Sequence, residues 1–447
     1  MNRSLPLATL LALSNFCHAA DWPSFRGPHQ DGSSPEKGLP TKFSKTEGVK
    51  WAAPLPGLSA SIPIVSGGKV FLTAPVEAQK QLVGLCYDAK TGKELWRKVI
   101  FEGGLQWDNK SNLASPSAAV DGQRVVFLFA NALVACFDYE GRELWKRDIK
   151  ETHGAFATQW TYGSSPVLDG GKLYIQVLQR NEVWDFQGVQ KGTPGKDLSS
   201  YLLALDPATG QDLWKVVRPS EALSESLESF STPIFIDYGG ARQMLVTGGN
   251  CLTGHDAATG KELWRWGNWN PDQDKNMRLV PCAVAGDGVA VVCSPKNRPT
   301  FGVKLGLSGN LDDSALAWTS DPKVVTSDVS TPAYADGSFY VLDSNRKILS
   351  RVEPKSGKVL WTGETGSKSK FESSPTVADG KVYAINFWGD VYVMAAGGEK
   401  FELLSINEMG DGTKPNGDAK SCRSSIAAAD GCLFIRTQDK LYCVGKN

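Results

Sequence analysis

The stretch that decides the fold is Tyr87-Asp88-Ala89-Lys90-Thr91-Gly92-Lys93-Glu94-Leu95-Trp96, because variants of it recur along the chain. The other clear copies are residues 138–145, 206–214, 256–264 and 353–361. In each copy an acidic side chain can accept hydrogen bonds from the local backbone, and a glycine suits the positive φ of a tight turn. Each copy is therefore predicted to be a β-hairpin whose second strand carries an outward-reaching tryptophan. Such internal repetition is typical of solenoids and propellers.

A second motif precedes each hairpin. It reads Ser-x-Pro, a few alternating residues, Asp-Gly and then a β-rich run, as in residues 115–122, 165–170 and 374–383. Proline is tolerated at the start of a strand, and Asp-Gly between apolar runs is a strong hairpin signal. One repeat is therefore predicted to contain four strands.

The two motifs can be counted independently, and each occurs eight times. First strands are marked at Pro63, Pro116, Pro166, Pro233, Pro281, Pro332, Pro375 and Ile426. Outer strands are marked at Trp51, Trp96, Trp145, Trp214, Trp264, Trp318, Trp361 and, in degenerate form, residues 401–404. The last repeat stops near Val444 without a fourth strand, so residues 49–53 are expected to supply it. The sequence thus predicts an all-β, eight-bladed propeller with four-stranded blades, closed by the N-terminal strand.

The N-terminal residues predict an exported protein. Arg3, the apolar run 5–13 and the small residues up to Ala20 are typical of a signal peptide. We expect residues 1–20 to be removed, although Cys17 could instead carry a lipid anchor. Residues 21–48 are then an irregular arm and residues 49–447 the propeller. The mature protein is expected in the periplasm or outside the cell, with no transmembrane segment.

The composition limits the partners. Lys+Arg and Asp+Glu both number 48, so the formal net charge is zero and nothing favours nucleic acid. We expect a monomer with an unidentified protein or peptide partner. One large insertion, residues 179–199, contains Trp184 and Phe186 and is predicted to be an ordered loop on one face of the ring.

Eight cysteines follow the predicted signal peptide, namely Cys86, Cys136, Cys251, Cys282, Cys293, Cys422, Cys432 and Cys443. Cys86, Cys136 and Cys443 occupy equivalent positions in their repeats, where other copies have alanine. This indicates that they fill space as small apolar residues. Two pairs, Cys282 with Cys293 and Cys432 with Cys443, could each form a bridge across a hairpin in an oxidising compartment. The sequence leaves both pairings open.

The tandem Ala-x-Thr-Gly-Lys-Glu-Leu-Trp units resemble the pyrroloquinoline-quinone-type propeller repeat. This repeat occurs in quinoprotein alcohol dehydrogenases and in the β-propeller lipoprotein of the outer-membrane barrel assembly machinery. Residues 21–28 are also similar to the mature start of secreted planctomycete-type proteins with the repeat. The resemblance covers nearly the whole mature chain and implies the fold strongly, but it implies an activity only weakly.

The resemblance to the dehydrogenases implies features that this chain lacks. Those enzymes use a metal to polarise the quinone and a carboxylate base, and a vicinal disulfide covers the cofactor. Here no two cysteines are adjacent, and no Cys-x-x-Cys-His haem motif occurs. Residues 272–276 begin like a calcium loop, but Met277 replaces its glycine. We therefore expect a non-enzymatic binding or scaffold protein without a cofactor or metal. The alternative is a quinoprotein dehydrogenase with pyrroloquinoline quinone and calcium, or a sugar-like small-molecule enzyme, using the central channel.

Propeller geometry predicts where a ligand would bind. The segments just before the first strands converge on one mouth of the central channel. They carry Trp160, Tyr162, Glu228, Phe230, Arg278, Asp328, Phe371, Glu372 and Arg423, with Leu113 and Thr161 beside them. These aromatic and charged groups could hold a polar ligand, or the charges could pair with one another and stabilise the funnel.

Overall fold

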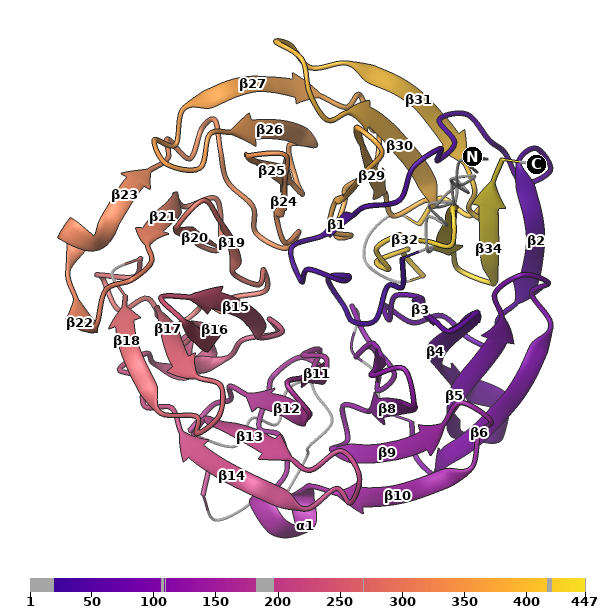
Figure 1. Ribbon diagram of the computed structural model, residues 1–447, viewed down its shortest axis with the longest axis horizontal. Coiled ribbons are helices and arrows are strands. Elements are labelled where there is room, and N and C mark those ends of the chain that lie inside the picture. Colours follow the sequence, from indigo (N-terminus) through magenta and orange to yellow (C-terminus); the bar gives the residue numbers. More distant parts are fainter. Residues whose placement is uncertain are drawn as a thin grey trace, which may run out of the picture.

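The computed structural model describes residues 20–105, 108, 110–181, 197–267, 269–415 and 420–446. Residues 1–19 of the predicted signal peptide, and Trp184 and Phe186 of the predicted insertion, lie outside these residues. Within the described part, the strands form eight sheets arranged as a closed ring around a central channel (Figure 1). The predicted eight-bladed propeller is therefore confirmed.

The first four blades follow one another along the chain, and each is an antiparallel meander. Blade 1 contains β3 (Ile64–Ser66), β4 (Lys69–Val76), β5 (Gln81–Asp88) and β6 (Glu94–Glu102). Blade 2 contains β7 (Ala119–Val120), β8 (Arg124–Leu128), β9 (Leu133–Asp138) and β10 (Glu143–Asp148). Blade 3 contains β11 (Val167–Asp169), β12 (Lys172–Val177), β13 (Tyr201–Leu205) and β14 (Asp212–Val217). Blade 4 contains β15 (Ile234–Tyr238), β16 (Ala241–Gly248), β17 (Cys251–Asp256) and β18 (Glu262–Trp266), and β22 (Gly309–Leu311) pairs with β18 in parallel.

The last four blades repeat this plan. Blade 5 contains β19 (Val284–Gly286), β20 (Val289–Cys293), β21 (Thr300–Lys304) and β23 (Leu316–Thr319). Blade 6 contains β24 (Ala333–Ala335), β25 (Ser338–Asp343), β26 (Ile348–Val352) and β27 (Val359–Glu364). Blade 7 contains β28 (Thr376–Ala378), β29 (Lys381–Ile385), β30 (Asp390–Ala395) and β31 (Leu403–Glu408). Blade 8 contains β32 (Ala427–Ala429), β33 (Cys432–Arg436) and β34 (Lys440–Gly445), and its outer strand is β2 (Val49–Pro54).

Helical structure is confined to short connections. These are η1 (Glu77–Gln79), α1 (Lys150–His153), η2 (Ser224–Leu227) and η3 (Asp313–Ala315). Within the described residues, no helix is long and apolar enough to cross a membrane.

The ring closes where the N-terminal strand meets the last hairpin. β2 pairs antiparallel with β34, and Trp51 lies opposite Cys443. The prediction that residues 49–53 complete the last blade is therefore confirmed. Closure leaves no blade without a neighbour, which removes the free faces of an open array.

The recurring hairpin turn is built as the sequence indicates. Asp88 Oδ1 accepts hydrogen bonds from the backbone N–H groups of Lys90 and Thr91. Gly92 has a φ of 72°, and an added Cβ there would lie 2.5 Å from the ring of Trp51. Glycine is therefore required both by the turn and by the tryptophan that packs on it from the neighbouring blade.

The hairpin pattern predicted tryptophans that reach outward. In the structure they instead pack between blades and join one blade to the next. Six of them donate their Nε1–H to a backbone carbonyl in the next blade. These bonds are Trp51 to Ala89, Trp96 to Tyr139, Trp145 to Pro207, Trp214 to Ala258, Trp318 to Pro354 and Trp361 to Gly397. Trp264 instead donates to Gln243 of its own blade. The side chains are large enough to fill the wedge between two twisted sheets while their one polar atom stays paired.

A second set of links encircles the channel. Each runs from a backbone N–H at the start of one blade to a side-chain oxygen or sulfur in the next blade. The links are Ile62 to Ser117, Ser117 to Ser165, Ser165 to Thr232, Thr232 to Cys282, Cys282 to Thr331, Thr331 to Ser374 and Ser374 to Ser425. Between the last and first blades, Ser424 Oγ donates to the carbonyl of Ser61. These links give the buried N–H groups of the inner strands an acceptor.

Residues 21–48 cross one face of the ring and contact blades at both ends of the chain (Figure 1). Trp22 pairs with Val65 in blade 1, and β1 (Ser33–Ser34) pairs with β28 in blade 7. Between them, the buried Arg26 donates to the carbonyls of Pro332 and Pro375 in blades 6 and 7. We call residues 21–48 the N-terminal arm.

The described cysteines are all free and buried. Neither of the two bridges that the sequence left open is present. In blade 5, Cys293 pairs with Thr300 of β21, whose Oγ1 donates a hydrogen bond to the Cys293 sulfur. Burial raises the pKa of Cys86, Cys136 and Cys293 to about 12, which agrees with the interpretation as apolar fillers.

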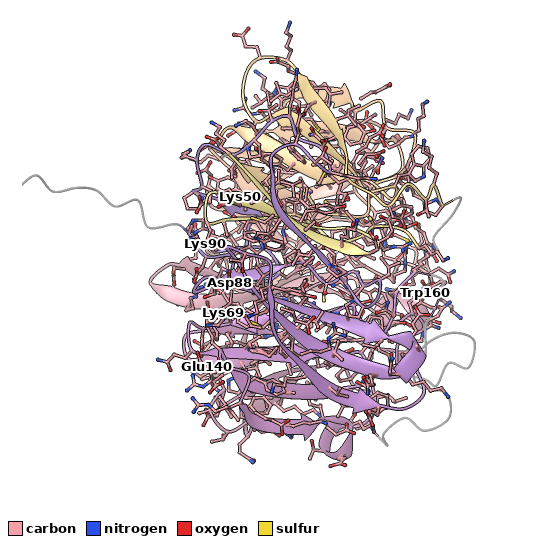
Figure 2. All side chains as sticks on the ribbon, turned by 90° about the vertical axis from the view of Figure 1, so that its right-hand side faces the viewer. Lys50, Lys69, Asp88, Lys90, Glu140 and Trp160 are labelled. Atoms are coloured by element: carbon pink, nitrogen blue, oxygen red, sulfur yellow. The ribbon has the colours of Figure 1, made fainter. Side chains whose placement is uncertain are left out.

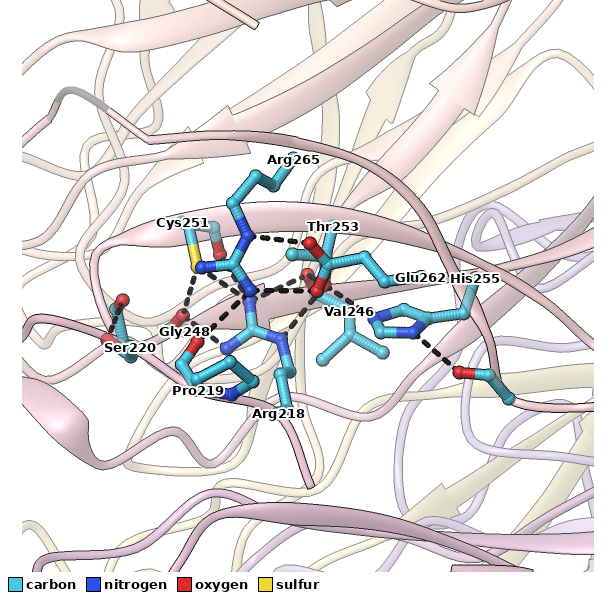
Figure 3. Close-up of polar contacts among 12 residues, drawn as sticks. Arg218, Pro219, Ser220, Val246, Gly248, Cys251, Thr253, His255, Glu262 and Arg265 are labelled. Carbon is cyan, nitrogen blue, oxygen red and sulfur yellow. Dashed lines mark hydrogen bonds and ion pairs between the residues drawn. The ribbon is translucent and has the colours of Figure 1, made fainter. Parts of the chain in front are cut away.

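A buried arginine that follows the outer strand of blade 3 reaches into blade 4, where backbone oxygens hold it (Figure 3). Arg218 Nε donates to Thr253 Oγ1 at 2.9 Å, and its two terminal nitrogens donate to the carbonyls of Gly248 and Cys251. His255 lies beside this group, with Nδ1 on the carbonyl of Gly260 and Nε2 on Thr253 Oγ1. Burial first, and then the Arg218 charge, lower the pKa of His255 to about 4.

The inner links predict a measurable cost for one lost acceptor. Thr232→Val keeps the shape of the side chain but leaves the Ser165 N–H buried without a partner. We expect it to lower the free energy of unfolding by about 1–3 kcal/mol in denaturant titrations. Thr232→Ser keeps the acceptor and should lose about 1 kcal/mol or less. If the valine variant is as stable as the serine variant, the links do not stabilise the ring.

The neutral His255 predicts a loss of stability in acid. The unfolded chain binds this proton at a higher pH than the folded chain, so stability is full above about pH 6.5 and is lost as pH falls toward 4. The contribution is about 3 kcal/mol. Unfolding of the wild type and of His255→Gln should therefore be compared at pH 7.5 and pH 4.5. The variant should show a flatter pH dependence, and parallel curves would contradict the prediction.

Candidate functional site

A cavity of about 180 Å³ lies in the central channel. Its wall is made by the segments at the start of the blades, and an aromatic side chain of the N-terminal arm adds to it. The lining residues are Phe25, Ala60, Lys110, Ser111, Ser115, Trp160, Thr161, Gly163, Ser165, Phe230, Arg278, Val280, Val329, Thr331, Glu372, Ser374, Arg423 and Ser425. We call this cavity the central cup.

The cup is open at one face of the ring and covered at the other. The arm pairs with Val65 and Ala378, which lie in the first strands of their blades, whereas Trp160 and Arg278 precede the first strands. The arm and the mouth therefore lie at opposite ends of the channel. Trp160 accordingly lies on the face opposite to Lys90 and Asp88 (Figure 2). Phe25 of the arm lines the cup from the covered side and is called its floor.

Five of the nine predicted site residues line the cup, namely Trp160, Phe230, Arg278, Glu372 and Arg423. Thr161, which the sequence placed beside them, lines it too. The other four are not among the lining residues. Tyr162 is buried and donates to the carbonyl of Gln176, and Phe371 is buried against Tyr392. Glu228 and Asp328 bond to neighbouring side chains and backbone, and Leu113 is buried in the core.

The charges at the mouth pair with one another across blades. Arg423 Nε donates to Glu372 Oε2 at 2.7 Å, and these two residues come from blades 8 and 7. Arg278 lies 3.6 Å from Glu225 and 3.4 Å from Asp328. The Lys110 ammonium lies 4.9 Å from the centre of the Trp160 ring. The pairing that the sequence offered as the alternative to ligand binding is therefore present, but the longer Arg278 contacts leave that guanidinium able to exchange partners.

Glu228 is a structural residue rather than part of the mouth. Its side chain is fully buried, where it pairs with Arg180 and accepts the backbone N–H of Gln159. Burial raises the pKa of Glu228 to about 7, against the lowering effect of Arg180. The pair joins blade 3 to the segment that precedes blade 4. Through the bond from Gln159 to Glu228, it also supports the segment that carries Trp160 and Thr161.

Sequence reasoning missed the floor and part of the wall. Phe25 belongs to residues 21–28, whose sequence resembles other mature N-termini. No motif in that stretch indicates that the arm covers the channel. Lys110 and Ser111 lie before the first strand of blade 2, and their position could have indicated them. A serine or threonine recurs directly before several first-strand prolines, as at Thr232, Thr331 and Ser374. In the structure these side chains accept the hydrogen bonds of the inner links.

Residues 39–189 and 198–445 match the protein family described as outer membrane protein assembly factor BamB. The chain belongs to this family. The match covers the ring on both sides of the predicted insertion, and it supports the resemblance to the pyrroloquinoline-quinone-type propeller repeat.

Curated relatives of the chain fall into two groups. A BamB from Alteromonas naphthalenivorans is 27% identical over 251 residues, which are 53% of this chain and 51% of that protein. A polyvinylalcohol dehydrogenase from Pseudomonas sp. is 28% identical over 37% of this chain and 24% of its own length. A quinoprotein ethanol dehydrogenase from Pseudomonas aeruginosa is 30% identical over 34% of this chain and 22% of its own length. The matches thus span between 22% and 51% of the relatives' own lengths.

Solved structures of both groups share the fold. The quinohemoprotein alcohol dehydrogenase from Comamonas testosteroni superposes with a TM-score of 0.63 at 12% identity, covering 96% of this chain and 81% of that one. BamB from Moraxella catarrhalis superposes with a TM-score of 0.58 at 11% identity, covering 89% of this chain and 97% of that one. At these identities the likeness concerns the fold alone.

The structural role of Glu228 predicts that substitutions of Glu228 and Arg180 do not act independently on stability. Arg180→Met leaves the carboxylate buried without its cation, so we expect a loss of about 3–5 kcal/mol in the free energy of unfolding. Arg180→Met combined with Glu228→Leu should recover most of that loss. The matched control is Arg278→Ala at the open mouth, which should cost about 1 kcal/mol or less. A double variant that is no better than Arg180→Met alone would show that the pair is not the reason for the burial.

Proposed function

We propose that the chain is an exported, non-enzymatic binding propeller, and that the central cup accepts one apolar side chain of a partner peptide with acidic neighbours. The observation that carries this proposal is the shape of the cup. It has an aromatic floor, an apolar wall and a charged mouth at one face only.

The size of the cup favours a side chain over a cofactor. Pockets for small molecules are usually about 300–1,000 Å³, and this cavity is about 180 Å³. A closed apolar cavity of about 150 Å³ accommodates benzene. A phenylalanine or leucine side chain is therefore of suitable size, and Phe25, Phe230 and Val280 provide apolar contacts for it.

The charge of the lining favours acidic neighbours of that side chain. Lys110, Arg278 and Arg423 line the cup, whereas Glu372 is the one acidic residue among the described lining residues. Arg278 lies 3.6 Å from the carboxylate of Glu225 and 3.4 Å from that of Asp328, so exchange of Asp328 for a partner's carboxylate loses little. Charge at the mouth would set the orientation and the rate of association.

The residues of the cup do not fit a metal–quinone centre. Such a centre needs several oxygen ligands for the metal in addition to cations for the quinone carboxylates. The described residues contain no group of three or more His, Cys, Asp or Glu side chains that could hold a metal ion. The carboxylates near the mouth are bonded to Arg278 and Arg423 instead. We therefore assign no redox step to this chain.

Two further observations support a binding role outside the cytoplasm. The family description names an assembly factor of the outer membrane, which is a role in association rather than catalysis. The residues before the arm also have the pattern of an export signal. We propose a monomer whose partner is a protein segment.

The test uses fluorescent peptides with the purified mature chain. One peptide has a central phenylalanine between aspartates, a second has glycine at the centre, and a third has lysines in place of the aspartates. Only the first should bind well, as measured by fluorescence anisotropy. Arg278→Ala with Arg423→Ala should weaken its binding at least about tenfold, whereas Arg142→Ala, an exposed arginine elsewhere on the ring, should leave binding unchanged.

Two outcomes would reject the proposal. Equal binding of the three peptides, or unchanged affinity in the double variant, would exclude the cup as the peptide site. Tight binding of pyrroloquinoline quinone with calcium, accompanied by dye reduction with an alcohol, would establish the alternative function instead.

A further inference from the structure

A second pocket lies where the ring is closed, on the face opposite the Trp160 mouth. Figure 2 shows Lys50, Lys69, Asp88 and Lys90 together on that face. The pocket has a volume of about 460 Å³ and is lined by Lys50, Gly67, Gly68, Lys69, Asp88, Ala89, Lys90, Leu95, Asp430, Cys432 and Cys443. We call it the junction pocket, because its residues come from blade 1, from blade 8 and from the closing strand β2.

Two cysteines of blade 8 reach this pocket side by side. Cys432 of β33 lies opposite Gly445, and Cys443 of β34 lies opposite Phe434. The two cysteines are therefore diagonal neighbours on the same face of the hairpin. The two thiols therefore lie close enough to influence each other's ionisation. Neither of the other two cysteines at this repeat position, Cys86 and Cys136, has such a partner among the described residues.

A lysine completes the arrangement. A Cβ added to Gly445 would lie 2.8 Å from Cys432 Sγ and 2.9 Å from Lys50 Cε. The absence of a side chain at Gly445 thus leaves the space through which Lys50 reaches the sulfur. Lys50 and Cys432 thus border the same small space, and a nearby positive charge favours the thiolate form of Cys432.

The charged groups near Cys432 come from several elements, and Glu36 of the N-terminal arm accepts the backbone N–H of the adjacent Gly431. The charged groups that line the pocket are Lys50 on β2, Lys69 on β4, Asp88 and Lys90 at the turn after β5, and Asp430 before β33. The hydrogen bond from Cys443 and the charge of Lys50 lower the pKa of Cys432 to about 7, although burial acts against them. The same hydrogen bond raises the pKa of Cys443. The two thiols are therefore unequal, and Cys432 is the one that ionises more readily.

We propose that the junction pocket is a thiol-modification site for small anionic disulfides, with Cys432 as the attacking thiol and Cys443 as the resolving thiol. The three lysines attract the anionic groups of the reagent, and the volume of the pocket admits a molecule of that size. No part of this site belongs to the central cup, so the proposal is independent of peptide binding there.

The chemistry is a two-step thiol–disulfide exchange. The Cys432 thiolate attacks one sulfur of the reagent, whose S–S bond breaks, so that a mixed disulfide forms and one thiolate leaves. Cys443 then gives its proton to solvent, and its sulfur attacks Cys432 and expels the second thiolate. Overall, the two cysteine thiols are oxidised to a disulfide and the reagent is reduced to two thiols. Diagonal residues lie slightly farther apart than bonded cysteines usually do, so β33 and β34 must approach during the second step.

The first experiment measures thiol reactivity in the folded, reduced mature chain. The chain is treated briefly with iodoacetamide between pH 5.5 and 9, and each of the eight cysteines is quantified by peptide mass spectrometry. Cys432 should react at least about tenfold faster than Cys86 at pH 7, because the thiolate is the reacting species. Its rate should rise with a midpoint near pH 7. Lys50→Gln should slow the reaction several-fold and move the midpoint upward, while Lys93→Gln, on the same face but outside the lining, should not.

The second experiment uses oxidised glutathione as the anionic disulfide. The wild type should form the Cys432–Cys443 disulfide and release two equivalents of glutathione. Cys443→Ser should stop at glutathione bound to Cys432, and Cys432→Ser should give neither product. Cystamine, a cationic disulfide, should react more slowly than oxidised glutathione at low ionic strength.

The results separate the parts of the proposal. Labelling of Cys432 no faster than of Cys86 would overturn it, even if the cysteine variants fail to fold, because that measurement uses the wild type. A mixed disulfide that persists in the wild type would overturn the role of Cys443. Equal rates with cystamine and oxidised glutathione would overturn the preference for anionic reagents. Peptide binding at the central cup should be unchanged by all of these modifications.

Discussion

The structure depends on how each blade is attached to the next one, because a single four-stranded sheet has two apolar faces and is not stable alone. The outer attachment is the tryptophan that packs on a glycine of the neighbouring turn and donates its N–H to a carbonyl there. The inner attachment is the series of backbone N–H groups bonded to hydroxyl or thiol groups of the next blade. The tryptophans hold neighbouring sheets together at the outer edge of the ring, and the N–H links hold them together beside the channel. Two contacts at different distances from the axis fix the angle between neighbouring sheets.

The N-terminal arm turns this ring into a receptacle with one opening. Arg26 and Trp22 attach the arm to blades at opposite ends of the chain, and Phe25 between them reaches the channel. A propeller without such an arm would expose the inner strands at both faces. The two faces therefore differ in kind. One carries the central cup with paired charges at its mouth, and the other carries the arm and the junction pocket with its two thiols.

The sequence was sufficient for the fold because the repeat is strict where geometry is demanding. The positive φ at Gly92, the acidic acceptor at Asp88 and the strand-opening prolines are local requirements, and each is visible in one stretch of chain. The closing role of Trp51 followed from counting strands. The central cup was predicted only in part. Position before a first strand correctly indicated Trp160, Arg278 and Arg423, but it could not distinguish a side chain at the mouth from one behind the wall, such as Glu228 or Tyr162. That distinction depends on rotamers and on partners such as Arg180 that are distant in sequence. The floor at Phe25 and the pairing of Lys50 with Cys432 depend on contacts between the two ends of the chain, which no local pattern indicates.

The strand exchange at the closure has a consequence for biogenesis. β2 is made first and ends at Pro54, but its partner β34 begins only at Lys440, about 390 residues later. At synthesis rates of roughly 5–20 residues per second, the strand waits for roughly 20–80 seconds before its partner exists. During that interval its backbone donors and Trp51 have no native neighbour in blade 8, and the arm has no blade 6 or 7 to hold it. Productive folding of this molecule therefore requires that β2 and the arm stay free of premature association until the last blade has been synthesised.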